Sequence, residues 1–114
     1  MNDKIIRDPS TLVERLIEAG EAWADLNAAA DALEETKGAV LGSILREHFD
    51  EPAWKADAQA KSDERYTKHI AAMVEARRKA NKAKIRYDSG KAFVELARSA
   101  ESTRRAEMNL AGGR

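Results

Sequence analysis

Apolar residues recur at alternating intervals of four and three along the first part of the chain. This spacing places them on one face of a helix that packs against a second helix. The series comprises Leu12, Leu16, Ala19, Trp23, Leu26, Ala30 and Leu33, followed by Val40, Leu41, Ile44 and Leu45. Asp8 can cap this helix with Pro9 in its first turn, or Thr11 and Glu14 can form a capping box. The pattern predicts a helix over about 10–49. Gly38 and Gly42 weaken it by about 1 kcal/mol each relative to alanine, and a close helix contact or gentle kink would explain them.

The stretch "FDEPAW", residues 49–54, is the clearest break in the chain. Asp50 can cap a new helix, and proline at position 52 is tolerated only in a first helical turn. We therefore predict a turn at about 50–52 and a second helix over about 53–110. Its buried column is spaced by sevens, and a column of mostly small residues follows three positions later. These columns are Tyr66, Met73, Ala80, Tyr87 and Val94, then His69, Ala76, Ala83, Gly90 and Ala97.

The predicted core also includes Trp54, Ile70 and Phe93. Trp54 should seal the end of the hairpin beside the turn, and Trp23 should pack over alanines. In the alternative interpretation, either tryptophan is a binding hot spot for a partner.

The "DSG" at 88–90 is a possible break in the second helix. The amphipathic segment after it either folds back as a short third helix or continues as one long helix that pairs with another chain. We favour the long helix.

Folding the two helices antiparallel about residues 50 and 51 pairs positions whose numbers sum to about 101, because both helices rise equally per residue. Leu33 then faces His69, and Leu16 lies level with Ile85. Large side chains of the first helix meet small ones of the second, so the two can interdigitate. The predicted fold is all-α: a single domain over residues 1–114, built as a long antiparallel helical hairpin or coiled coil and forming a homo-oligomer.

Composition narrows the picture further. The 114 residues fit one small domain, 35% of them are charged and only 5% are aromatic, which is typical of long helices rather than a thick globular core. There is no cysteine, so disulfides and thiolate chemistry are excluded. No signal peptide and no apolar run of membrane-spanning length is evident, which favours the cytoplasm of a bacterial cell.

Charge is distributed unevenly although the net charge is zero. Residues 8–64 hold fourteen acids and five bases, whereas residues 77–105 hold ten bases and three acids. Five bases recur every seven residues, and four more widen this basic stripe; the nine are Arg77, Lys84, Lys91, Arg98 and Arg105, with Arg78, Lys79, Lys82 and Arg86. The stripe either tracks nucleic-acid phosphates or pairs with the acids of the first helix. Overall neutrality and the scarcity of aromatics favour the second interpretation.

No residue pattern indicates catalysis or metal binding. His48 and His69 lack the spacing of a metal-ligand motif, and adjacent carboxylates such as Glu34 and Glu35 diverge on a helix. The serines have no histidine at a plausible distance, and no glycine-rich phosphate loop is present. We predict no catalytic, cofactor-binding or metal-binding residues.

The closing pattern "AKIRYDSGKAFVELARSAESTRRAEMNL", Ala83 to Leu110, resembles the C-terminal halves of small all-helical proteins encoded by bacteriophages and prophages. The resemblance implies an accessory role in a phage genome, near recombination or replication genes. Taken together, the sequence predicts a non-enzymatic helical interaction protein that acts through protein contacts. The alternative is a sequence-independent nucleic-acid-binding accessory protein that uses the stripe at 77–105.

Overall fold

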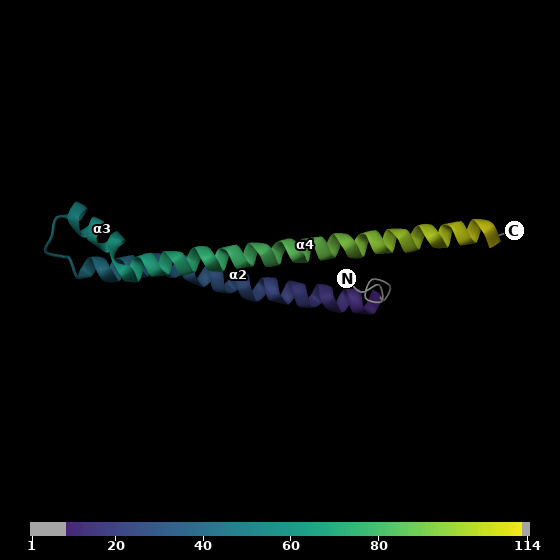
Figure 1. Cartoon of the computed structure of the whole chain (residues 1–114), viewed down its shortest axis with the longest axis horizontal. Coiled ribbons are helices and arrows are strands. Elements are labelled where there is room, and N and C mark those ends of the chain that lie inside the picture. Colours follow the sequence, from purple (N-terminus) through teal and green to yellow (C-terminus); the bar gives the residue numbers. More distant parts are fainter. Residues whose placement is uncertain (1–8, 113–114) are drawn as a thin grey trace. The chain divides into compact units, whose positions relative to one another are not determined.

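The computed structural model describes residues 9–112. This part of the chain forms three helices, α2 (Pro9–Arg46), α3 (Ala53–Ser62) and α4 (Glu64–Gly112), and contains no strand (Figure 1). The prediction of an all-α helical hairpin is confirmed. Within the described residues, no helix combines the length and the apolar character that crossing a membrane would require.

The helices contribute to two compact units. The central unit comprises Trp23–Lys82, which includes all of α3. The described part of the terminal unit comprises residues 9–22 of α2 and 83–112 of α4. Each unit therefore brings together segments of α2 and α4 that lie far apart in the sequence.

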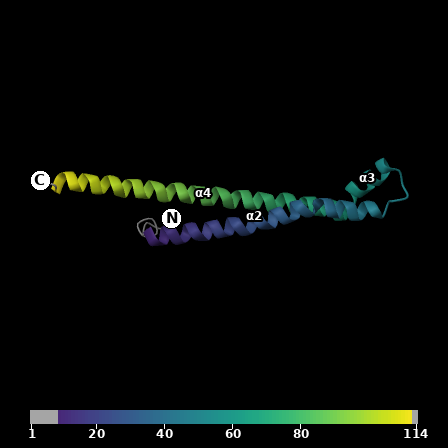
Figure 2. The ribbon, with the colours of Figure 1, turned by 180° about the vertical axis from the view of Figure 1, so that it is seen from behind.

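The central unit contains most of the buried core. Its buried side chains are Ala30, Ile44, Ala56, Ala60 and Ala80, and Ile44 is the largest fully buried side chain of the described residues. In the seam, the Nε2 atom of His69 lies 2.7 Å from the carbonyl oxygen of Leu33, so the predicted facing of these two residues is confirmed. Helix α3 folds back beside the C-terminal end of α2 and the start of α4 (Figures 1 and 2). Its Ala56 and Ala60 are buried.

In the terminal unit, α2 and α4 approach each other closely at two glycines. A Cβ atom at Gly20 would lie 3.0 Å from Cε1 of Tyr87, and one at Gly90 would lie 3.1 Å from Cδ1 of Leu16. The predicted register is therefore wrong here, because Leu16 meets Gly90 and not Ile85, which is exposed. The physical reason is local: Gly90 has no side chain, so the Leu16 side chain packs there against the backbone of α4.

Both predicted columns of the second helix are confirmed as its inward face. Every member of the two columns is buried or half-buried, and so is every apolar position of the predicted seam on α2. This agreement follows from the heptad spacing, which keeps the same face of each helix turned toward its neighbour.

The boundaries of the second helix differ from the prediction. The first helix ends at Arg46 instead of about 49, and the helix expected from 53 is interrupted at Asp63, whose ψ of 137° is extended. The Asp63 carboxylate accepts a hydrogen bond of 2.8 Å from the backbone N–H of Arg65 and so caps the start of α4. Helix α4 then continues through 88–90 without a break, as the long-helix interpretation expects.

The predicted burial of Trp54 is wrong. Trp54 is 75% exposed, because it precedes the inward-facing Ala56 by two positions and so lies on the opposite face of α3. Phe93, predicted for the core of the hairpin or of an oligomer, is 37% exposed within one chain and lies one position off the seam residue Val94. Gly38 and Gly42 mark no close helix contact, because a Cβ atom at either would meet nothing within 4 Å.

Candidate interaction surfaces

Arg77 links α4 to α2 through three acceptors in the central unit. Its Nε donates to Glu34 Oε2 at 2.7 Å, its Nη1 to Asn27 Oδ1 at 2.7 Å, and its Nη2 to Asp31 Oδ1 at 2.6 Å. A second bond from Nη2 to Glu34 Oε1, at 2.9 Å, makes the Glu34 pair bidentate. The predicted pairing of the basic stripe with acids of the first helix is confirmed at this residue.

The Arg77 cluster also shifts the ionisation of its members. The hydrogen bond from Arg77 holds the pKa of the Glu34 carboxyl below its ordinary value. Hydrogen bonds to Glu34 and then Asp31 raise the pKa of the Arg77 guanidinium. Both shifts favour the charged forms of Arg77 and Glu34, so this pair stays ionised around neutral pH.

Other bases of the stripe pair with acids of their own helix. Arg78 pairs with Glu75, and the Nζ of Lys91 lies 3.4 Å from Asp88 and 4.8 Å from the centre of the Tyr87 ring. Arg105 lies 3.6 Å from Glu101, which Arg104 also contacts. Such exposed pairs three or four residues apart support the helix only slightly. They do not join α4 to the acidic helix.

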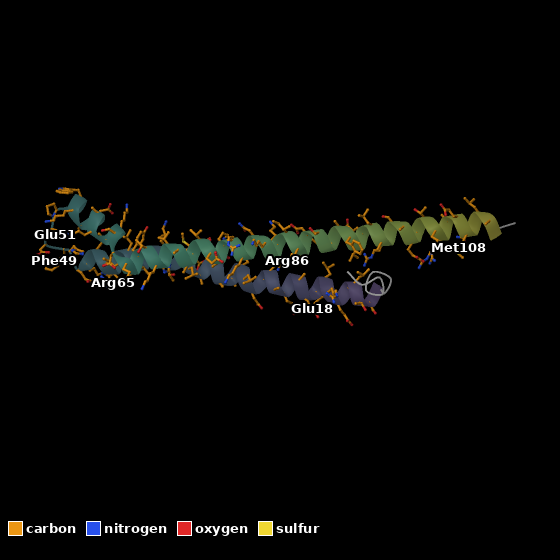
Figure 3. The ribbon with its side chains drawn as sticks, in the orientation of Figure 1. Glu18, Phe49, Glu51, Arg65, Arg86 and Met108 are labelled. Atoms are coloured by element: carbon orange, nitrogen blue, oxygen red, sulfur yellow. The ribbon has the colours of Figure 1, made fainter. Side chains whose placement is uncertain are left out.

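The remaining bases of the stripe face solvent. Among the described residues, no ion pair forms at Lys79, Lys82, Arg86 or Arg98, all of which are exposed. Figure 3 shows the Arg86 position on α4. Lys84 is exposed and has an interaction partner. In the stripe, Arg77 therefore pairs with acids of α2, Arg78, Lys91 and Arg105 pair with acids of α4, and four bases form no ion pair among the described residues.

A second arginine cluster, at the start of α4, was not predicted from the sequence. Arg65 donates to both carboxylate oxygens of Glu47, at 2.7 and 3.1 Å, and to both of Asp63, at 3.0 and 2.9 Å. These bonds lower the pKa of Asp63 to about 2, chiefly through the side chain of Arg65, and they lower that of Glu47 as well. The sequence feature that could have predicted this cluster is Asp63, two positions before Arg65. An N-cap carboxylate accepts a hydrogen bond from the backbone N–H two positions later.

The segment 47–57, here called the tip loop, consists of the turn after α2 and the first residues of α3. It exposes two aromatic side chains. Phe49 is 88% exposed, and Trp54 is exposed as described above. Figure 3 shows Phe49 and Glu51 in the turn that follows α2, and Arg65 at the start of α4. The loop has four carboxylates and one lysine; two of the carboxylates, Glu47 and Asp57, pair with Arg65 and Lys61 outside it, so Asp50 and Glu51 supply most of its remaining negative charge. Exposed aromatics in an acidic surround are features of a protein-binding patch rather than of a core.

The terminal unit contains an open groove, here called the arginine groove, between the first turns of α2 and the later turns of α4. It has a volume of about 1030 Å³, and its apolar lining comes from Leu12, Val13, Val94, Ala97 and Ala100. Its charged lining comes from Arg98, Glu101, Arg104 and Arg105, a net charge of plus two. Apolar walls with cationic edges are suited to an apolar ligand that has acidic neighbours.

The two histidines have separate local partners. His48 Nδ1 lies 3.5 Å from Glu51 Oε2, whereas His69 meets the backbone of Leu33 and, at 3.4 Å, the hydroxyl of Thr36. Within residues 9–112 there is no cluster of three or more His, Asp or Glu side chains placed to hold a metal ion.

Comparison of the chain with protein families, with curated proteins and with solved structures finds no match in any of the three. The candidate surfaces therefore rest on the geometry and chemistry of this chain alone.

Proposed function

We propose that the chain is a non-enzymatic helical interaction protein that acts by protein–protein contacts, including contacts with further copies of itself. The observation that carries this proposal is the imbalance between small buried and large exposed apolar side chains. Of the six hydrophobic residues that are buried in the described part of the chain, five are alanines. In the same part, ten large hydrophobic residues are exposed: Val13, Ile17, Phe49, Trp54, Val74, Ile85, Phe93, Leu96, Met108 and Leu110.

The energetic argument is direct. Fully burying a side chain of the size of valine, leucine or phenylalanine contributes about 1.5–3 kcal/mol relative to leaving it in water. Scattered exposed apolar residues are normal on a protein surface. Among the described residues, the buried side chains are almost all alanines and the large side chains of the seam are only half-buried, so covering even a few of the exposed large residues against another chain adds appreciably to the apolar area that one chain buries.

The proposal includes an accessory role in a phage or prophage. Its support is the closing sequence pattern at Ala83–Leu110, together with the small size and purely helical build of the described chain.

The test is the mass of the full chain in solution, measured by sedimentation equilibrium or light scattering over a range of concentrations. We expect a mass above the 12.6 kDa of one chain, rising with concentration. A mass of 12.6 kDa throughout, with no partner recovered by cross-linking in a native host, would contradict the proposal.

A second candidate function is supported by the exposed bases Lys79, Lys82 and Arg86, which form no ion pair in the part of the chain that the structure describes. Such bases can neutralise phosphates, and each phosphate contact contributes about 0.9 to the slope of log K against log salt on duplex DNA. We expect only weak binding of labelled duplex or single-stranded DNA, lost at ordinary salt. Tight binding whose salt slope falls in Lys82→Ala with Arg86→Ala would favour this second function instead.

A further inference from the structure

We infer that the arginine groove receives the tip loop of a second copy of the chain, so that copies associate head to tail. This inference rests on the proposed function and names the surfaces through which self-association occurs. Its basis is the match in both apolar character and charge between two surfaces that are open to solvent among the described residues.

The tip loop provides the inserted part of this contact. Phe49 and Trp54 are two of the six aromatic residues in the chain, and both project into solvent. Large aromatic side chains are the commonest anchors of protein interfaces, because they bury much area at a small cost in conformational freedom.

The arginine groove provides the receiving part. Its apolar lining is open to solvent at Val13 and Ala100, and Arg98 forms no ion pair among the described residues. A guanidinium at the edge of an apolar groove can pair with a carboxylate and also lie across an aromatic ring. Asp50 and Glu51 directly follow Phe49, so acids accompany the aromatic side chain that would enter the groove.

Charge decides which surfaces of two copies meet. Two tip loops, each with a surplus of carboxylates, repel each other, and so do two arginine grooves, each with a net charge of plus two. Of the pairings between these two surfaces, only that of a tip loop with a groove attracts. It is heterologous, since each copy offers a different surface, and such contacts build chains or rings of copies rather than a two-fold dimer.

The experiment uses two variants of the full chain, each defective in one surface. The tip variant has Phe49→Ala with Trp54→Ala, and the groove variant has Arg98→Glu with Ala100→Glu. All four positions are exposed, so the helices should form as in the wild type, which circular dichroism checks. The control is Ile85→Ala, which removes a similarly exposed apolar side chain outside both surfaces.

Sedimentation velocity should show wild type and control growing with concentration, while each variant alone associates at least about tenfold more weakly. An equimolar mixture of the two variants retains one intact tip loop and one intact groove. It should form a heterodimer of twice the chain mass that grows no further.

Three outcomes separate the inference from the proposed function. A wild-type chain that stays monomeric would overturn both. Variants that assemble like the wild type, or separate variants that fail to combine when mixed, would overturn the head-to-tail contact while leaving self-association intact. As an independent check, Asp50→Arg should weaken assembly, and adding Arg98→Glu to the same chain should restore it; failure of this rescue would also overturn the contact.

Discussion

At the scale of single residues, two arginines have special positions because they bind acceptors on other segments. Arg77 joins α4 to three acceptors of α2, and Arg65 joins the start of α4 to the turn after α2. A guanidinium presents several donors in one plane, and lysine, with a single ammonium, cannot reproduce this pattern.

We expect Arg77→Lys to lower the melting temperature by a few degrees, because the bidentate bond to Glu34 and the bond to Asn27 cannot all be kept. The matched control is Arg78→Lys, whose pair with Glu75 lies within α4 and should matter little. Thermal melts followed by circular dichroism measure both. Equal melting temperatures for the two variants would show that the Arg77 cluster does not hold the helices together.

The Asp63 carboxyl should make stability dependent on pH in the acid range. Its pKa is about 2 in the folded chain against an ordinary value of 3.8, so the folded state prefers the ionised form. The resulting stabilisation is complete above about pH 4 and is lost as pH falls through about 2. Melting temperatures measured between these values should fall with pH in the wild type and fall less steeply in Asp63→Asn. Parallel curves for the two proteins would refute this assignment.

At the scale of elements, the glycines show where α2 is constrained by packing and where it is not. At Gly20 the ring of Tyr87 occupies the space that a Cβ atom would need, whereas Gly38 has open space around it. Gly38 therefore reduces helix stability without allowing a close contact in this chain.

Gly38→Ala should raise the free energy of unfolding by up to about 1 kcal/mol, the difference in helix propensity between the two residues. Gly20→Ala should give no such gain, since its new methyl group would press on Tyr87. Urea denaturation of both variants measures the difference. If Gly38→Ala destabilises the chain instead, that face of α2 must be covered by a partner.

At the scale of the whole molecule, two compact units each have a thin seam rich in alanine. A seam of small side chains lets helices approach closely but buries little apolar area per residue. Under the proposed self-association, covering the remaining apolar surface would add to this stability.

We therefore expect the melting temperature to rise with protein concentration, because binding that favours the folded state stabilises it by mass action. The dependence should weaken in the tip variant and persist in Ile85→Ala. A melting temperature that is the same at every concentration would argue that each chain is stable by itself.

Much of the local architecture was predictable from the order of residues alone. Heptad spacing identified the inward faces of α2 and α4, because the helical period decides which side chains share a face regardless of what they meet. The reversal near Pro52 followed equally from the missing N–H and fixed backbone angle of proline.

Tertiary structure decided the register and the fate of individual side chains. Residues 47–63 form a capped turn and a short helix instead of a tight reversal. In the terminal unit, Leu16 packs at Gly90, where the lack of a side chain makes room for it. Packing in the central unit turns Ala56 inward and leaves Trp54 in solvent, and it places Arg77 of the stripe against acids of α2. Periodicity specifies faces but not offsets between helices, because an offset is set by the sum of all contacts along both of them.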